Sequence, residues 1–161
     1  MHNHGVSPEL RHRVLREKVR AMKAIWAEED AEFHGEFVDF APILTGLRPL
    51  QQPHPPILIG GQGHGGIART VEYGDGWFPI VYEELDFGPQ MQELKRRGQA
   101  AGQPAAPVTA VIWKIGEPLM QKCAELGVDR CVVVYHAEDK DGAQIWMLCA
   151  VMGTGLGRIG S

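Results

Sequence analysis

The chain has 161 residues, of which 44% are hydrophobic and 22% charged, with a formal net charge of −4. These values are typical of one globular domain with a packed core, and they exclude wholesale disorder and a strongly basic, nucleic-acid-binding surface. The longest apolar run, residues 145–152, is too short to span a bilayer, and polar residues 1–5 do not resemble a signal peptide, so we expect a cytoplasmic protein.

The first 30 residues predict an amphipathic helix. Ser7-Pro8-Glu9 has the order typical of a helix start, with an N-cap serine, a proline at the first helical position and an acid in the first turn. Apolar residues then recur at spacings of three and four, which predicts a core-facing stripe. The stripe comprises Leu10, Val14, Val19, Met22, Ile25 and Trp26.

Residues 31–56 predict a hairpin followed by a loop. Phenylalanines flank His34-Gly35-Glu36, which favours a tight turn between two short strands. The segment 42–56 contains five prolines and predicts a loop. A loop this long inside a compact domain is usually functional or partly mobile.

Residues 57–136 alternate between strand and helix patterns. Short apolar strands are predicted at 57–59, 76–81, 108–112 and 130–135, and helices at 67–73, 93–101 and 117–126. This alternation favours a parallel sheet with crossover helices, either an open doubly wound sheet or part of a (β/α)₈ TIM barrel. A whole barrel needs roughly 250 residues, so about four strands predict an incomplete (β/α)₈ barrel built from its C-terminal βα units.

Residues 137–161 form a divergent tail. From Gly142 the tail carries no charge until Arg158, and it ends in a glycine-rich run. Its apolar stretch, residues 145–152, needs a surface to cover, and we expect that stretch to cap one edge of the sheet.

A glycine-rich turn, residues 60–66, is the most informative local pattern. It follows a buried strand and opens a helix, so its backbone can approach an anion and its N–H groups can bind a phosphate, although such turns are as often purely structural. His64 and Arg69 are placed to meet a phosphate or to lie in solvent. Asp75 could be a catalytic carboxylate, but we favour hydrogen bonding to nearby backbone N–H groups. Trp77 could stack on a ligand ring, but we favour packing in the core.

No metal site is predicted. The seven histidines lie on separate predicted elements, without paired ligand spacing. Cys123, Cys131 and Cys149 show no CxxC spacing, and we expect each of them to be a small buried hydrophobic residue.

Four blocks together resemble the luciferase-like monooxygenase family, most closely its deazaflavin-dependent branch. They are residues 16–26, the hairpin 33–37, the strand and turn 55–61, and 74–77. The resemblance implies a TIM barrel that binds reduced flavin mononucleotide (FMN) or the deazaflavin coenzyme F-420. It further implies that the cofactor, and its phosphate above all, is held by Gly60, Gly61, Gln62, Gly63, Trp77, Pro79 and Ile80.

The family's first half, which carries most of its catalytic side chains, has no counterpart in this sequence, so we assign no catalytic residue. We expect a flavin- or deazaflavin-linked oxidoreductase, or a fragment of one, that forms a homo-oligomer or needs a partner chain to complete the barrel. Two alternatives stay open. One is a non-catalytic flavin-binding or assembly module derived from the same barrel, and the other is an unrelated open α/β binding domain.

Overall fold

The structure is a computed structural model that describes residues 7–46, 48–113, 116–138 and 144–153, with side chains described up to residue 134. It divides into two compact units, which we call the N-terminal unit (residues 1–56) and the sheet unit (residues 57–161).

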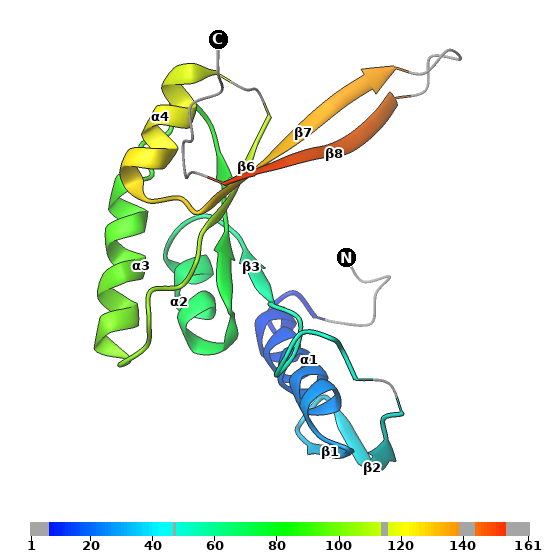
Figure 1. The fold of residues 1–161 in the computed structure, drawn as a ribbon. Coiled ribbons are helices and arrows are strands. Elements are labelled where there is room, and N and C mark those ends of the chain that lie inside the picture. The colour runs from blue at the N-terminus through cyan, green and yellow to red at the C-terminus, as the bar shows by residue number, and fades with distance from the viewer. Residues whose placement is uncertain (1–6, 47, 114–115, 139–143, 154–161) are drawn as a thin grey trace. The chain divides into compact units, whose positions relative to one another are not determined.

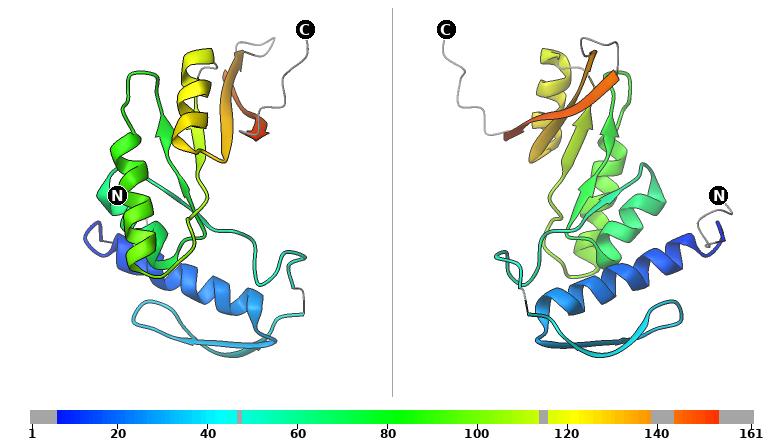
Figure 2. Two further views of the ribbon diagram at one scale, coloured as in Figure 1. Left: turned by 60° about the vertical axis from the view of Figure 1, so that its left-hand side comes forward. Right: turned by 90° about the vertical axis from the view of Figure 1, so that its right-hand side faces the viewer.

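The N-terminal unit pairs a helix with a hairpin. Helix α1 spans Arg11–Ala27, and strands β1 (Asp30–His34) and β2 (Asp39–Leu44) are antiparallel. Both views in Figure 2 show the hairpin lying along α1. The predicted hairpin is therefore present, with its turn between the two strands.

Helix α1 begins later than its sequence signal. The backbone N–H of Leu10 donates to the carbonyl of Ser7 at 3.0 Å, so one tight turn precedes the α-helix, which starts at Arg11 and not at Pro8. The buried residues are Val14, Val19 and Ala21, whereas Met22 is 39% exposed and Trp26 is half-buried. The prediction that Met22 faces the core is thus wrong, because the hairpin covers a narrower stripe of α1 than the apolar periodicity indicates.

The sheet unit has parallel strands joined by helices. In chain order they are β3 (Leu58–Gly60), α2 (His64–Tyr73), β4 (Gly76–Phe78), β5 (Ile80–Val81), α3 (Gly88–Ala100), β6 (Thr109–Ile112), α4 (Glu117–Leu126) and β7 (Arg130–Glu138). Strand β4 pairs with β3, and β5 pairs with β6, which in turn pairs with β7, all in parallel. The predicted parallel strands with crossover helices are confirmed.

Pro79 separates β4 from β5 within one continuous extended segment. A proline cannot donate a hydrogen bond to a neighbouring strand, but the carbonyl of Pro79 still accepts from the N–H of Val111 at 2.8 Å. Trp77 bridges to Val108 on the same side, so the described strands have the order β3, β4/β5, β6, β7. They form an open sheet, and no closed barrel is present among the described residues.

All three helices of this unit cover the same face of the sheet (Figure 1). One buried cluster contains residues of α2, α3 and α4 together with alternate residues of β6 and β7, namely Ala110, Ile112, Cys131 and Val133. Since successive strand residues point to opposite faces, helices packed on these residues all lie on one side. This arrangement matches a segment of a barrel wall and differs from a doubly wound sheet, which carries helices on both faces.

The tail contributes a further strand. Strand β8 (Gln144–Gly153) pairs antiparallel with β7, in a register that runs from Glu138 opposite Gln144 to Arg130 opposite Gly153. The prediction that the apolar stretch 145–152 caps one sheet edge is confirmed. An antiparallel strand has no place in the all-parallel sheet of a (β/α)₈ barrel, so the tail departs from that pattern as expected.

Candidate functional site

The glycine turn, residues 60–66, follows the carboxyl end of β3. Gly61 has φ of +114° and Gly63 has φ of +80°, which are conformations that L side chains rarely adopt. The first bonds of α2 run from the N–H groups of Gly66 and Ile67 to the carbonyl of Gly63. The N–H groups of His64 and Gly65 precede these bonds and have no intrahelical acceptor, as is usual in the first turn of a helix.

Two side-chain hydrogen bonds hold the turn against the neighbouring strand segment. The indole Nε1 of Trp77 donates to the carbonyl of Gly61 at 2.9 Å, and the Nε2 of Gln62 donates to the carbonyl of Ile80. These bonds bring the turn together with two of the residues predicted beside it. Trp77 itself is 1% exposed and belongs to the buried cluster, so it supports the turn from beneath, as the core-packing interpretation expects.

The remaining predicted site residues lie at the same edge of the sheet. Pro79 is fully buried between β4 and β5, and Ile80 is 37% exposed. Gly60, Gly61 and Gln62 are exposed. The turn thus presents backbone to solvent at the carboxyl edge of the parallel strands, which is where α/β barrels bind their ligands.

The guanidinium of Arg69, one helical turn into α2, lies over the glycine turn. Its Nη2 is 3.2 Å from the position that a Cβ atom on Gly61 would occupy, and its Nη1 is 3.2 Å from the same position on Gly65. A Cβ on Gly66 would meet the carbonyl oxygen of Gly61 at 2.3 Å, so the helix and the turn approach each other as closely as glycine allows. The result is an exposed stretch of glycine backbone beside a positive charge.

Asp75 lies at the opposite edge. Its carboxylate accepts a hydrogen bond from the N–H of Ile57 at 2.8 Å, while its own N–H donates to the carbonyl of Ile57 at 2.8 Å. Because Asp75 precedes β4 and Ile57 precedes β3, both residues are at the amino edge of the sheet. The expected role in backbone hydrogen bonding is confirmed, although the bonds cross between strands.

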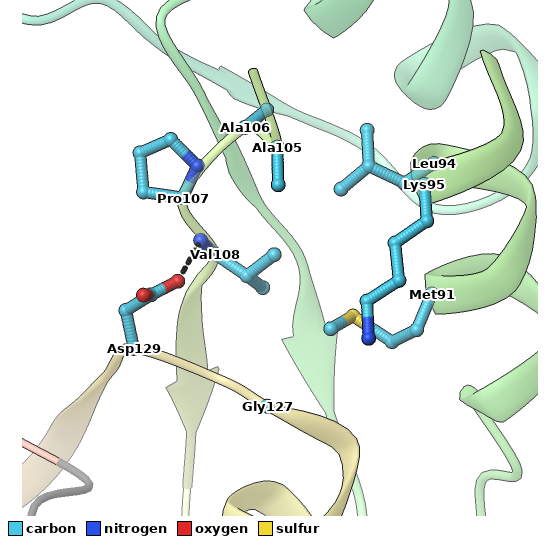
Figure 3. A pocket seen from close by; sticks show the side chains of 9 residues that line it. All are labelled: Met91, Leu94, Lys95, Ala105, Ala106, Pro107, Val108, Gly127 and Asp129. Carbon is cyan, nitrogen blue, oxygen red and sulfur yellow. Dashed lines mark hydrogen bonds between the residues drawn. The ribbon is translucent and has the colours of Figure 1, made fainter. Parts of the chain in front are cut away.

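A cavity also lies at this amino edge, and we do not assign it to the ligand site. It has a volume of about 150 Å³ and lies between α3 and the start of β6 (Figure 3). Asp129 lines it and accepts from the N–H of Val108 at 2.7 Å, repeating the contact that Asp75 makes with Ile57. In barrels of this class the amino edge is associated with stability, and the carboxyl edge carries the ligand site.

Two exposed aromatic residues at the carboxyl edge were not predicted from the sequence. Tyr82 follows β5 and Trp113 follows β6, and each is 45% exposed. The sequence could indicate these two residues only by their position directly after a strand. This position can be recognised only where the strand ends are known to within one residue.

A model of the luciferase-like monooxygenase family matches residues 1–115. The chain therefore belongs to the luciferase-like monooxygenase family. Among curated proteins it is 36% identical over 131 residues to an uncharacterized protein of Mycobacterium tuberculosis, a match that covers 78% of this chain and 45% of the relative. The chain thus spans about half the length of this relative.

Two further matches are to named monooxygenases. The chain is 29% identical over 92 residues to the FMNH(2)-dependent dimethylsulfone monooxygenase of Pseudomonas putida, covering 57% of this chain and 25% of that protein. The solved structure of the monooxygenase RslO1 from Streptomyces bottropensis aligns with a TM-score of 0.54 at 22% identity, over 76% of this chain and 39% of that one. The structural match supports a mixed α/β fold with parallel strands, consistent with the luciferase-like barrel type.

Within the described residues, no helix is long and apolar enough to cross a membrane.

Proposed function

We propose that this chain supplies the phosphate-binding part of a flavin- or deazaflavin-dependent monooxygenase site. The glycine turn and the start of α2 would hold the cofactor phosphate. The observation that carries the proposal is the geometry of Gly61, which combines a positive φ, an exposed backbone and the neighbouring Arg69 guanidinium. Two of the relatives are named as flavin-dependent enzymes, which supports a cofactor of this class.

The residues present fit such a phosphate. N–H groups at the start of α2 point away from the helix, the positive end of the helix dipole lies there, and Arg69 adds a full charge. Gln62 and Trp77 would fix the turn before the ligand arrives, so little ordering would remain to oppose binding. A reduced flavin or deazaflavin, when bound, supplies the electrons for the redox chemistry, and the protein supplies anchoring and orientation.

The cofactor in this proposal is either FMN or coenzyme F-420, since both carry a phosphate that the turn could bind. The whole reaction would also need the part of the family's barrel that this chain does not match. We therefore assign the chain a cofactor-anchoring role within an oxidoreductase and leave its catalytic residues unassigned.

Absorbance spectroscopy of the purified protein, mixed with each cofactor and separated from excess ligand, tests the proposal. Retention of a flavin or deazaflavin band is the expected result, and turnover is not required of a chain that has the anchoring role alone. Oxidation of an added substrate by the retained cofactor would show in addition that this chain is catalytic by itself. Absence of any band with both cofactors would contradict the proposal and favour an unrelated α/β domain.

A further inference from the structure

A cavity of about 170 Å³ opens at the carboxyl edge where β5 and β6 end. It is lined by Val81, Tyr82, Glu83, Glu84, Trp113 and Leu119. Sites for drug-sized ligands usually measure about 300–1,000 Å³, so this cavity suits a small molecule or one end of a larger one. It lies on the same edge of the sheet as the glycine turn, because β3, β5 and β6 are parallel.

Two aromatic side chains border the cavity from adjacent strands. Val81 pairs with Ile112, so Tyr82 and Trp113, the next residue on each strand, follow side by side in the register. Each leaves 45% of its surface exposed although most large apolar residues of this unit are buried. The face of an aromatic ring carries negative potential and attracts a cation within about 6 Å of its centre.

The loop after β5 adds negative charge. Glu83 and Glu84 line the cavity, and Asp86 follows them. The basic side chain of Lys122, on α4, contacts the same loop: its Nζ donates to the carbonyl of Leu85 at 2.8 Å and lies 5.9 Å from the centre of the Phe87 ring. The positive end of α4 is also close, and Glu117 in its first turn opposes that charge.

The same contacts fix the loop. The N–H of Leu85 donates to the carbonyl of Tyr82 at 3.2 Å, and the N–H of Gly88 donates to the carboxylate of Asp86 at 3.1 Å. Lys122 of α4 donates to the carbonyl of Leu85, so the loop has one contact with a helix in addition to its two internal hydrogen bonds. The backbone that carries Tyr82, Glu83 and Glu84 is thus held by hydrogen bonds, so little backbone ordering would oppose the binding of a ligand.

We propose that this cavity binds a small organic cation with a methylated nitrogen, such as a quaternary ammonium group. Aromatic faces together with carboxylates at a short distance are the chemistry that recognises such a group. A quaternary nitrogen has no N–H to satisfy, so it needs no hydrogen-bond acceptor in the cavity. Binding of this cation requires no cofactor and is independent of the proposed function. A role of the cation as a substrate would rest on the proposed function.

Isothermal titration calorimetry of the full chain with choline tests the proposal. The comparison ligand is 3,3-dimethyl-1-butanol, which has the same shape but no charge. We expect choline to bind at least tenfold more tightly than the neutral alcohol. Equal affinities, or no detectable choline binding at millimolar concentration, would overturn the proposal.

Matched substitutions locate the site. Trp113→Leu and Tyr82→Leu keep apolar bulk but remove the ring, and each should weaken choline binding at least threefold. Trp113→Phe and Tyr82→Phe keep a ring and should stay within twofold of the original chain. Glu83→Gln together with Glu84→Gln should weaken binding and reduce its dependence on salt concentration. Choline affinity unchanged by the leucine variants would overturn the assignment.

The cofactor experiment is run separately, without choline. Choline binding without flavin binding would support the cation site while contradicting the proposed function. Flavin binding without choline binding would overturn the cation site alone. The melting temperature of each variant, measured by circular dichroism, identifies any variant that has lost its fold, and the phenylalanine variants keep the test decisive in that case.

Discussion

Gly61 is the residue on which the phosphate proposal depends most. Its φ of +114° places its backbone where a side chain would be strained, and a Cβ atom there would meet Arg69 at 3.2 Å. A larger side chain would also cover the exposed backbone that the proposed phosphate would approach. The stability effect and the binding effect of a substitution are therefore both predictable and can be measured apart.

Gly61→Val should lower the affinity for the phosphate-bearing cofactor at least tenfold, which corresponds to about 1.4 kcal/mol. The free energy of unfolding should also fall, by about 1–3 kcal/mol, because valine at positive φ is strained. Titration of the cofactor and chemical denaturation measure the two effects. Unchanged cofactor affinity in the variant would remove the site assignment.

Gly102 provides the matched control, since it also has positive φ, of +65°, and nothing lies within 4 Å of its missing Cβ. Gly102→Val should lose a similar amount of stability and keep the cofactor affinity of the original chain. An equal loss of affinity in both variants would show that the effect comes from general destabilisation.

At the scale of single elements, one acidic side chain attaches the hairpin to α1. The carboxylate of Glu17 accepts hydrogen bonds from the backbone N–H groups of Phe37 at 2.7 Å, Glu36 at 3.1 Å and Val38 at 3.1 Å. These bonds, the one from Phe37 above all, hold the pKa of Glu17 below its usual value. Arg13 strengthens the same contact through its ion pair with Glu36.

The hairpin should therefore loosen in acid. A carboxyl group with a lowered pKa in the folded state stabilises that state above its unfolded pKa of about 4.5, and this contribution is lost as the pH falls further through the folded-state value. Hydrogen exchange measured by NMR should show that the amides of residues 36–38 lose protection between neutral pH and about pH 3. Glu17→Gln should make their protection low and nearly independent of pH. Protection equal to that of the original chain in this variant would contradict the anchoring role.

Two aspartates perform the same function at the amino edge of the sheet. Asp75 binds the N–H of Ile57 and Asp129 binds the N–H of Val108, in each case across to the neighbouring strand. Asp75→Ala should lower the free energy of unfolding by about 1–3 kcal/mol, because it leaves a backbone donor without its acceptor. Cofactor affinity should not change. Loss of cofactor binding with unchanged denaturation would instead place Asp75 in the ligand site.

Most elements of the sheet unit could be predicted because their signals are local. The apolar run that predicts the strand Thr109–Ile112 lies within the strand itself. The glycine that predicts the left-handed C-cap at Gly127 directly follows the last residue of its helix. Helix α3 starts at Gly88, five residues before the predicted start at residue 93, and Pro89 in its first turn is the sequence signal for this earlier start.

What the sequence could not predict depends on distant contacts. The pairing of β8 with β7 joins segments whose apolar character gives no register by itself. The bond from Trp77 to Gly61 links residues 16 positions apart, so this contact, unlike the predicted burial of Trp77, follows only from the structure. The ring surface of Tyr82 and Trp113 likewise requires the register of β5 against β6.

At the scale of the whole molecule, the strand order of the sheet ends in β3 on one side and in β8 on the other. Among the described strands, β3 pairs only with β4 and β8 pairs only with β7, so both outer strands have one unpaired side. On the face without helices, Val111 and Val132 are nonetheless buried, at 6% exposed each, whereas Ile80 is 37% exposed. The outer strands and the exposed apolar residues near the carboxyl edge are the features that a second copy or a partner chain would cover.

We accordingly predict that the chain self-associates or requires a partner, because unpaired strand edges and exposed apolar residues favour association. Light scattering over a dilution series should give a mass above that of one chain at micromolar concentration and a falling mass on dilution. A monodisperse monomer throughout the series would contradict the incomplete-barrel interpretation of the sheet unit.

The central claim is that the glycine turn binds a cofactor phosphate, and comparing FMN with riboflavin tests it most directly, because the two differ only in that phosphate. Quenching of flavin fluorescence on titration with the protein gives both affinities. The account predicts that FMN binds at least tenfold more tightly than riboflavin, and that Gly61→Val removes this difference. Equal affinity of the original chain for the two flavins, while both bind, would contradict it.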